Sequence, residues 1–146
     1  MEPANESCGH HRSGRQACTL DFFASSNMTT DPNCVFCRIV AGKIPSRKVF
    51  EDQEFFAFHD IHPWAPVHFL LIPKQHVPSL AQVESGDAEW IGRMMALIPK
   101  LAFEQGCQPY PEGGFRVLCN SGVQGGQEVH HLHLHVMGGP RPWLRG

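Results

Sequence analysis

Apolar side chains recur at helical spacing near the start of the patterned part of this sequence. Val35, Phe36, Ile39 and Val40 fall on one side of a helical turn, and Gly42 follows them. Glycine is a common residue just beyond the end of a helix. The pattern therefore predicts a short helix that stops before residue 42.

Short apolar runs predict five strands, at residues 48–51, 55–59, 68–72, 115–120 and 130–137. Residues 87–105 carry instead a broad apolar stripe that Gly106 closes, and this stripe predicts one long helix. Pro99 lies inside the stripe. We expect it to kink or divide the helix, because proline cannot donate a backbone hydrogen bond.

The order of these elements favours an α+β fold. One long helix interrupts the strands, most connections are short and βαβ alternation is missing, so we expect one domain with a mainly antiparallel sheet of about five strands. A chain of 146 residues suits a single domain. Residues 1–33 are polar and lack periodicity, and we expect a mostly disordered extension there, before a domain that spans residues 34–146.

Composition narrows the class of protein. A formal net charge of −2 argues against nucleic acid as a partner, because binding its backbone needs a surplus of Lys and Arg. We expect no membrane association, since no apolar run approaches the roughly 20 residues of a membrane helix. The first 20 residues also lack the apolar stretch of a secretory signal. Two of the six cysteines form a Cys-x-x-Cys pair, which inside a cell indicates metal or redox chemistry, and we expect a cytoplasmic protein.

Histidines are concentrated in one part of the chain, since eight of the ten lie within residues 59–135. His131, His133 and His135 alternate with apolar residues. In a strand this alternation would turn three imidazoles to one side and the apolar residues to the core. The competing interpretation is a solvated face on a half-buried strand.

A glycine-rich segment, residues 120–129, precedes the histidine run. Glycines let backbone N–H groups approach an anion such as phosphate, although a simple hairpin turn has the same composition. Beside imidazoles the segment becomes a candidate phosphate cradle. A neutral imidazole is a good nucleophile toward phosphorus, and N–H donors stabilise charge on the phosphoryl oxygens.

The run His131-x-His133-x-His135, with its apolar spacers, resembles the signature of the histidine triad (HIT) family of nucleotide hydrolases and transferases. The likeness is greatest to the Hint branch, the purine nucleoside phosphoramidases, and to its bacterial zinc-containing type. It covers about residues 34–143, through residues 36–39, 43–45, 58–61, 65–66, 68–69, 72–74 and 125–127.

The resemblance implies a reaction at the α-phosphate of purine nucleoside phosphoramidates or related AMP and GMP derivatives, with no catalytic metal. His133 matches the nucleophile that forms a nucleotidyl-histidine intermediate, which water then hydrolyses. His135 matches the residue that contacts the phosphate and assists the leaving group, and His68 matches one that orients the triad. Two other functions stay open: dinucleoside polyphosphate hydrolysis or nucleotidyl transfer, and a nucleotide-binding regulatory module with vestigial catalysis.

The resemblance also implies a substrate site in two parts. The residues that match the phosphate-binding part are Asn120, Gly126, Gln127, Glu128 and Val129. The residues that match the nucleoside pocket are Val35, Phe36, Ile39, Ile44, Phe58, His59, Asp60 and Ile61. Apolar walls suit a purine, and a carboxylate can accept hydrogen bonds from both ribose hydroxyls. Plain core packing of Phe36 and Ile39, and turn capping by Asp60, are the alternative interpretations. For Glu128 the backbone is expected to contribute rather than the carboxylate, which a phosphate would repel.

Cys34 and Cys37 supply two thiols from one helical turn, a common zinc half-site. Some bacterial members of the family complete a structural zinc site with residues that match His76 and His131 of this chain. Four such ligands form a closed set, which would brace the fold without taking part in the chemistry. A redox role for the cysteine pair is the alternative, and it is disfavoured because a polar tail replaces the strand that should precede such a pair.

Family members form homodimers that join two sheets into one, and the resemblance implies the same assembly here. Residues 140–146 match the tail that reaches toward the partner's site, with Trp143 buried at the dimer, and an exposed terminal aromatic is the alternative. The expected partners are therefore a purine nucleotide substrate and a second copy of the chain.

Overall fold

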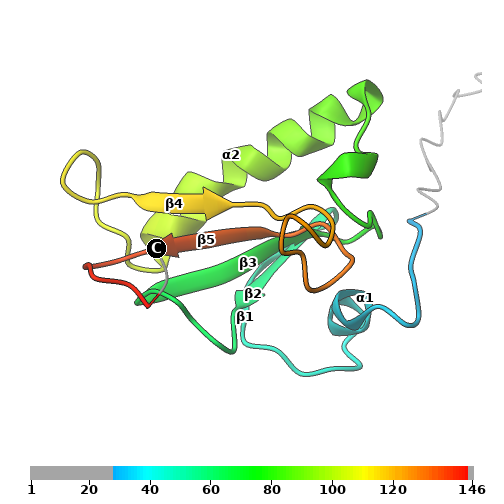
Figure 1. The fold of residues 1–146 in the computed structure, drawn as a ribbon, viewed down its shortest axis with the longest axis horizontal. Coiled ribbons are helices and arrows are strands. Elements are labelled where there is room, and N and C mark those ends of the chain that lie inside the picture. Colours follow the sequence, from blue (N-terminus) through cyan, green and yellow to red (C-terminus); the bar gives the residue numbers. More distant parts are fainter. Residues whose placement is uncertain (1–27, 145–146) are drawn as a thin grey trace, which may run out of the picture.

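The computed structural model describes residues 28–144. Residues 1–27 of the extension expected at residues 1–33 therefore lie outside the described range, as do residues 145–146. The elements follow one another as α1 (Val35–Val40), β1 (Lys48–Glu51), β2 (Phe55–His59), β3 (Val67–Pro73), the 3₁₀ turns η1 (Leu80–Gln82) and η2 (Ser85–Asp87), α2 (Ala88–Glu104), β4 (Phe115–Leu118) and β5 (Leu134–Gly138) (Figure 1). The predictions for the short helix and the first two strands are confirmed.

The five strands form one antiparallel sheet in the order β1-β2-β3-β5-β4. This sheet confirms the expected α+β fold. Paired residues of antiparallel strands point to the same face of a sheet. The pairing of Leu70 with His135 and of Leu71 with Leu134 therefore places His135 and Leu134 on opposite faces.

The two faces of the sheet carry different helices. Helix α2 covers one face (Figure 1), where its residues Met94, Ile98 and Leu101 are buried against the strands. Helix α1 lies against the other face, where Phe36 and Ile39 pack with apolar residues of β2 and β3. The alternation along β5 turns its leucine and valine toward α2 and its histidine toward α1. The core therefore lies mainly under α2, and the histidine site forms on the α1 side.

Helix α2 runs unbroken from Ala88 to Glu104, so of the two expected effects of Pro99 the division of the helix does not occur. Pro99 and Met95 are both exposed. The carbonyl of Met95 has no helical N–H to accept from, because residue 99 is proline, and it can accept a hydrogen bond from water instead. Burial of Ile98 on the inner side keeps the helix on the sheet. Neither this helix nor any other within residues 28–144 is long and apolar enough to cross a bilayer.

Strand β5 begins at Leu134, later than the sequence predicts. Continued pairing would set Pro73 opposite Leu132, but Pro73 has no N–H to donate. The Pro73 carbonyl accepts a hydrogen bond from Nε2 of His131 at 2.8 Å instead. The N–H of Leu132 donates to the carbonyl of Val77 at 2.6 Å. The ladder of backbone hydrogen bonds therefore stops at Leu134.

The prediction that three histidines share one strand is accordingly wrong for His131 and His133, which precede β5, and confirmed for His135. Strand β4 is shortened for the same reason. It ends at Leu118, opposite His135, and does not reach Asn120, because the chain before β5 leaves the sheet.

We predict that Pro99→Ala stabilises the protein. The substitution restores a helical N–H and relieves the contact with the carbonyl of Met95, so the free energy of unfolding should rise by up to about 3 kcal/mol. Thermal unfolding followed by circular dichroism measures the change. An unchanged or lower midpoint would show that the proline is tolerated at no cost.

Candidate active site and metal centre

A backbone carbonyl group fixes which ring nitrogen of His133 carries the proton. Its Nδ1 lies 2.7 Å from the carbonyl oxygen of His131, and because a carbonyl can only accept, Nδ1 carries the proton and donates it. The neutral ring then keeps its lone pair on Nε2. His133 is 5% exposed, and burial lowers its pKa below the ordinary value. His133 therefore presents an unprotonated nitrogen, the form of imidazole that can attack phosphorus.

His68 and His135 form a hydrogen-bonded pair beside His133. The backbone N–H of Trp64 donates to Nδ1 of His68 at 3.0 Å, so the proton of neutral His68 lies on Nε2. That Nε2 donates to Nδ1 of His135 at 2.9 Å, which leaves the proton of His135 on its own Nε2. Burial, and after it the neighbouring rings of His133 and His68, lowers the pKa of His135 to about 4. His135 is thus a neutral ring that offers an N–H, whereas His133 offers a lone pair.

Asp60 approaches the same pair of rings. Its Oδ2 lies 3.5 Å from Nε2 of His68 and 4.0 Å from Nδ1 of His135. Its Oδ1 accepts a hydrogen bond from the backbone N–H of His62 at 2.8 Å, as in an Asx turn. Burial lowers the pKa of His68, and the Asp60 carboxylate opposes this effect only in part. Asp60 therefore caps a turn and also faces the histidine pair.

The two functional nitrogens remain open to solvent. Within residues 28–144, Ser121 Oγ is the only fully buried side-chain polar atom without a hydrogen-bond partner. The Nε2 atoms of His133 and His135 also lack a partner in this part of the chain, so they keep some contact with solvent. The centroids of the two rings are 5.0 Å apart, which lets both reach one phosphoryl group.

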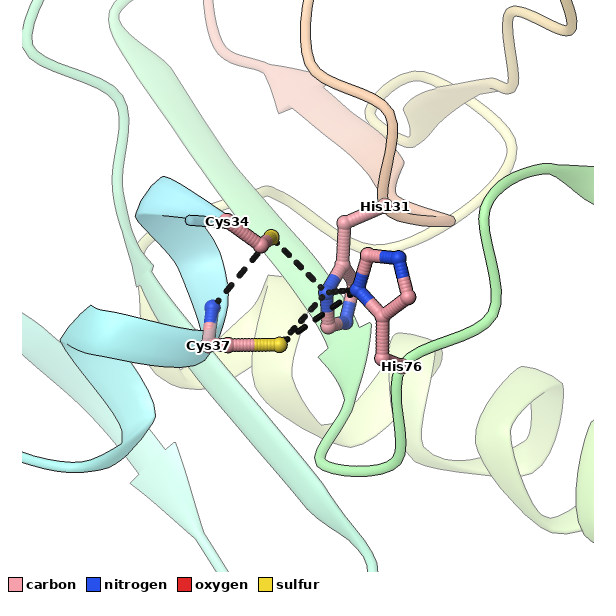
Figure 2. Close-up of side chains that lie close together, drawn as sticks. All are labelled: Cys34, Cys37, His76 and His131. Carbon is pink, nitrogen blue, oxygen red and sulfur yellow. Dashed lines mark hydrogen bonds between the residues drawn. The ribbon is translucent and has the colours of Figure 1, made fainter. Parts of the chain in front are cut away.

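His131 does not share a common space with this pair, and it lies instead in the cysteine and histidine group expected from the family resemblance. Its Nε2 donates to Pro73, and its Nδ1 faces Cys34, Cys37 and His76 (Figure 2). The three histidines of the signature are thus divided between two sites.

Cys34, Cys37, His76 and His131 could hold a metal ion, and Figure 2 shows their ligand atoms pointing toward one another. Nδ1 of His131 lies 3.4 Å from Sγ of Cys34 and 3.6 Å from Sγ of Cys37. Nδ1 of His76 lies 3.4 Å from Sγ of Cys37 and 3.2 Å from Nδ1 of His131. Tetrahedral zinc, at about 2.3 Å from sulfur and 2.0–2.1 Å from nitrogen, would separate neighbouring ligand atoms by roughly 3.3–3.8 Å. The four side chains therefore fit a closed tetrahedral site.

Hydrogen bonds set the protonation of His131 and hold His76 and Cys37 in place. Because Nε2 of His131 donates to a backbone carbonyl, the lone pair lies on Nδ1, and burial lowers the pKa of the ring to about 4. The N–H of His76 donates to the carbonyl of Thr29 at 2.6 Å, and Oγ1 of Thr29 donates to the carbonyl of His76 at 3.2 Å. The N–H of Asp31 lies 3.5 Å from Sγ of Cys37. The residues just before α1 thus belong to the surroundings of the cluster.

Asp60, His68 and His135 also bring three possible ligand atoms within 4.8 Å of one another. Hydrogen bonding argues against metal binding there. Nδ1 of His68 already accepts from Trp64, so a metal on Nε2 would need an imidazole with no proton on either nitrogen. This group suits hydrogen bonding to a substrate instead.

The glycine-rich segment closes on itself as a tight turn. The N–H groups of residues 125–127 donate to carbonyls within the turn. The side chain of Gln127 is buried and hydrogen-bonds to the backbone of Gly122, Pro78 and Val129, so it braces the turn. The N–H groups of residues 128–129 have no partner in the described part of the chain. Free backbone donors therefore precede the histidines directly, and the glycine N–H groups are already used.

Two other side chains of this segment lie nearer its surface. Nδ2 of Asn120 lies 3.5 Å from the carbonyl oxygen of Gly126. Glu128 is exposed, and its charge acts to raise the pKa of His133, although burial has the larger effect.

Four of the eight residues expected to line the nucleoside pocket meet in one apolar cluster beside α1: Phe36, Ile39, Ile44 and Phe58. Val129, expected in the phosphate-binding part, packs against the same cluster. The ring of Phe36 lies edge-on to that of His133, with centroids 5.2 Å apart. Val35 and Ile61 are 46% and 85% exposed and lie outside the buried part of this cluster. At the end of β2, burial and the charge of Arg47 lower the pKa of His59.

Trp64 is a site residue that the sequence analysis did not identify. Its indole stacks on His135, with centroids 5.4 Å apart and planes 12° apart. The available signal was an aromatic residue between Pro63 and Pro66, just before His68. Such a pattern marks a turn, but it does not show where the indole points.

The C-terminal segment folds back on its own chain. The indole N–H of Trp143 donates to the carbonyl of Gly139 at 3.0 Å, and the guanidinium groups of Arg141 and Arg116 lie 4.4 and 5.2 Å from the ring centroid. Trp143 also lines a cavity of about 1140 Å³, and no histidine of residues 28–144 lines it. In the single chain Trp143 is thus half-buried between two arginines.

Comparison with known proteins supports one family. A family model described as "Scavenger mRNA decapping enzyme C-term binding" matches residues 33–143. Protein HitA of Neisseria gonorrhoeae is 47% identical over 108 residues, which cover 74% of this chain and 97% of HitA. The structure of a histidine triad protein from Clostridium difficile has a TM-score of 0.72 at 40% identity and covers 78% of this chain and 96% of its own. That of a HIT family hydrolase from Legionella pneumophila Philadelphia 1 has a TM-score of 0.70 at 42% identity and covers 75% and 95%.

The matched residues 33–143 include both histidine sites described above, together with the whole sheet. Sequence identity and fold therefore agree over the same part of the molecule. The chain belongs to the histidine triad (HIT) family.

Proposed function

We propose that this protein hydrolyses the bond between the α-phosphorus and the leaving group of a purine nucleoside phosphoramidate, or of a related AMP or GMP derivative, through a nucleotidyl intermediate on His133. The hydrogen bond of 2.7 Å from Nδ1 of His133 to the carbonyl of His131 carries the proposal, because it leaves Nε2 unprotonated. A similar protein of known structure is described as a HIT family hydrolase.

The reaction would proceed in two displacements at one phosphorus atom. Nε2 of His133 attacks and forms a nitrogen–phosphorus bond while the bond to the leaving atom breaks. The Nε2–H of His135 donates a hydrogen bond to the leaving atom, which takes up a proton from water as it departs. A water molecule then attacks the same phosphorus and forms an oxygen–phosphorus bond while the bond to Nε2 of His133 breaks. The water gives one proton to the solvent, the nucleoside monophosphate leaves and neutral His133 is restored.

The surrounding residues would bind the rest of the nucleotide. We propose that the backbone N–H groups of Glu128 and Val129 hold the phosphoryl oxygens, since they have no other partner within residues 28–144. The apolar cluster around Phe36 would contact the purine, and Asp60 would accept hydrogen bonds from the ribose. The side chain of Gln127 would act indirectly by keeping the turn in shape.

We propose zinc as the ion for the second site. Two thiolates and two imidazoles are a common ligand set for zinc, and four protein ligands leave no open position for a substrate. The ion would therefore stabilise the fold. It would also fix His131, the residue whose carbonyl orients His133.

The assembly proposed is a homodimer with a continuous sheet. Strand β4 is an edge of the sheet in the described chain, and an unpaired edge offers backbone groups to a second copy. The free thiols of Cys34, Cys37, Cys107 and Cys119 suit a reducing compartment, and we propose the cytoplasm.

We predict that His133→Ala abolishes turnover of adenosine 5′-monophosphoramidate and lowers kcat by roughly 10⁴-fold or more. The exposed neighbour provides a matched control, since His130→Ala should keep full activity. Circular dichroism should show both variants folded.

Activity that survives His133→Ala would refute the assignment of the nucleophile. Assaying the wild type with diadenosine polyphosphate as well decides which bond it prefers. Tight AMP binding without turnover of either compound would favour a regulatory module.

In a plot of kcat/KM against pH, the loss of activity on the acid side should occur well below the ordinary pKa of histidine. Burial lowers the pKa of His135 to about 4, and the ring must be neutral to accept the N–H of His68. Activity should be lost as the pH falls through this value and should persist below pH 6.5, because burial also lowers the pKa of His133. A group with the usual pKa of about 6.5 would leave only roughly a tenth of the activity at pH 5.5, and such a profile would contradict the buried neutral pair.

Cys37→Ser should remove most of the bound zinc and lower the midpoint of thermal unfolding by on the order of 10 °C, because a ligand bound only by the folded state is lost. Elemental analysis of protein purified without added metal gives the zinc content. The matched control is Cys119→Ser, which lies outside the cluster and should keep one zinc per chain. Equal zinc in both variants would disprove the site.

A further inference from the structure

We propose that Trp64 is a positioning residue that holds His135 in the orientation in which its Nε2–H meets the leaving group. The inference rests on the proposed function and adds a residue to it. Trp64 lies in the loop between β2 and β3, next to Ala65, which is buried.

Three rings enclose the imidazole of His135. Trp64 stacks on it with an angle of 12° between the planes. The rings of His133 and His68 lie against it at angles of 67° and 45°, with centroids 5.0 and 5.2 Å away. His135 is 7% exposed as a result. Trp64 is the only one of the three that contacts His135 through a nearly parallel flat surface, so losing the indole would leave the imidazole free to tilt.

Trp64 also contacts His68, the histidine that is hydrogen-bonded to His135. Its backbone N–H donates to Nδ1 of His68, and its indole lies 5.4 Å from that ring. The backbone therefore sets which nitrogen of His68 donates to His135, while the side chain sets the plane of His135. Both effects require the loop to stay in place.

The C-terminal segment holds this loop. The N–H of Leu144 donates to the carbonyl of Trp64 at 2.8 Å. Gly139 has a φ of +97°, and a Cβ there would lie 2.8 Å from Cβ of Pro66, so the tail approaches the loop as closely as a glycine allows. Trp64 is thus fixed from the tail on one side and from the histidine pair on the other.

A positioning role predicts a dependence on the leaving group. The hydrogen bond from His135 stabilises charge on the departing atom, so it matters most when that atom is strongly basic. An alkylamine leaves poorly without this help, whereas nitrophenolate leaves well on its own. A purely structural role for Trp64 would change both reactions alike.

The experiment compares Trp64→Leu and Trp64→Phe on two substrates, an adenosine 5′-phosphoramidate of an alkylamine and the 4-nitrophenyl ester of AMP. For the phosphoramidate, Trp64→Leu should lower kcat by roughly 10- to 100-fold with little change in KM. For the ester, kcat should change by less than about twofold, because that leaving atom needs little help. Trp64→Phe keeps a flat ring and should restore most of the phosphoramidate activity.

Trp90→Leu is the matched control, because Trp90 is partly buried and packs against the core cluster on the α2 side, away from the histidines. It should affect both substrates equally. Equal losses on both substrates in Trp64→Leu, no loss on either, or a Phe variant as impaired as the Leu variant would overturn the inference. Failure of the wild type to turn over either substrate would instead overturn the proposed function itself.

Discussion

The site depends on one buried hydrogen bond, from Nδ1 of His133 to the carbonyl oxygen of His131. It decides which nitrogen of His133 carries the proton and therefore which one can attack. The carbonyl is in place because the His131 ring is held on both nitrogens, by Pro73 on one side and by the cysteine cluster on the other. Breaking the bond would leave a buried polar group without a partner, at a cost of about 1–3 kcal/mol. The same residue thus belongs to the cysteine cluster and also positions His133 in the neighbouring site.

The second functional ring is controlled in the same way. The backbone N–H of Trp64 places the proton of His68, and His68 in turn places the proton of His135. Two chemically identical side chains, His133 and His135, therefore differ at Nε2, which carries a lone pair in His133 and an N–H in His135. Burial keeps both rings neutral, because it lowers the pKa of each.

Much of this arrangement could be predicted from the sequence, because periodicity and motif spacing are local properties. Periodicity predicted the bounds of α1, β1 and β2, and motif spacing predicted the cysteine pair. The family resemblance added the two histidines that the structure brings beside that pair. The start of β5 could not be predicted, because it depends on Pro73 of another strand. The alternation of histidines predicts three rings on one side of a strand. The hydrogen bond from Nε2 of His131 to the carbonyl of Pro73 instead turns the His131 ring away from the other two.

Other features also needed tertiary information. Pro99 is tolerated in α2 because it lies on the exposed side, which the sequence pattern alone did not decide. Trp64 gave no signal of its function, since its role depends on an indole reaching across to β5. The turn at residues 125–127 had the composition of a phosphate cradle, but its N–H groups are used internally. Local patterns therefore located the site, and long-range contacts determined its chemistry.

The most direct measurement is the protonation of the His133 ring, by ¹⁵N–¹H NMR of histidine-labelled protein near pH 7. The account predicts a proton on Nδ1, protected from exchange by the His131 carbonyl, and an unprotonated Nε2. A ring with its proton on Nε2, or one charged on both nitrogens at that pH, would contradict it.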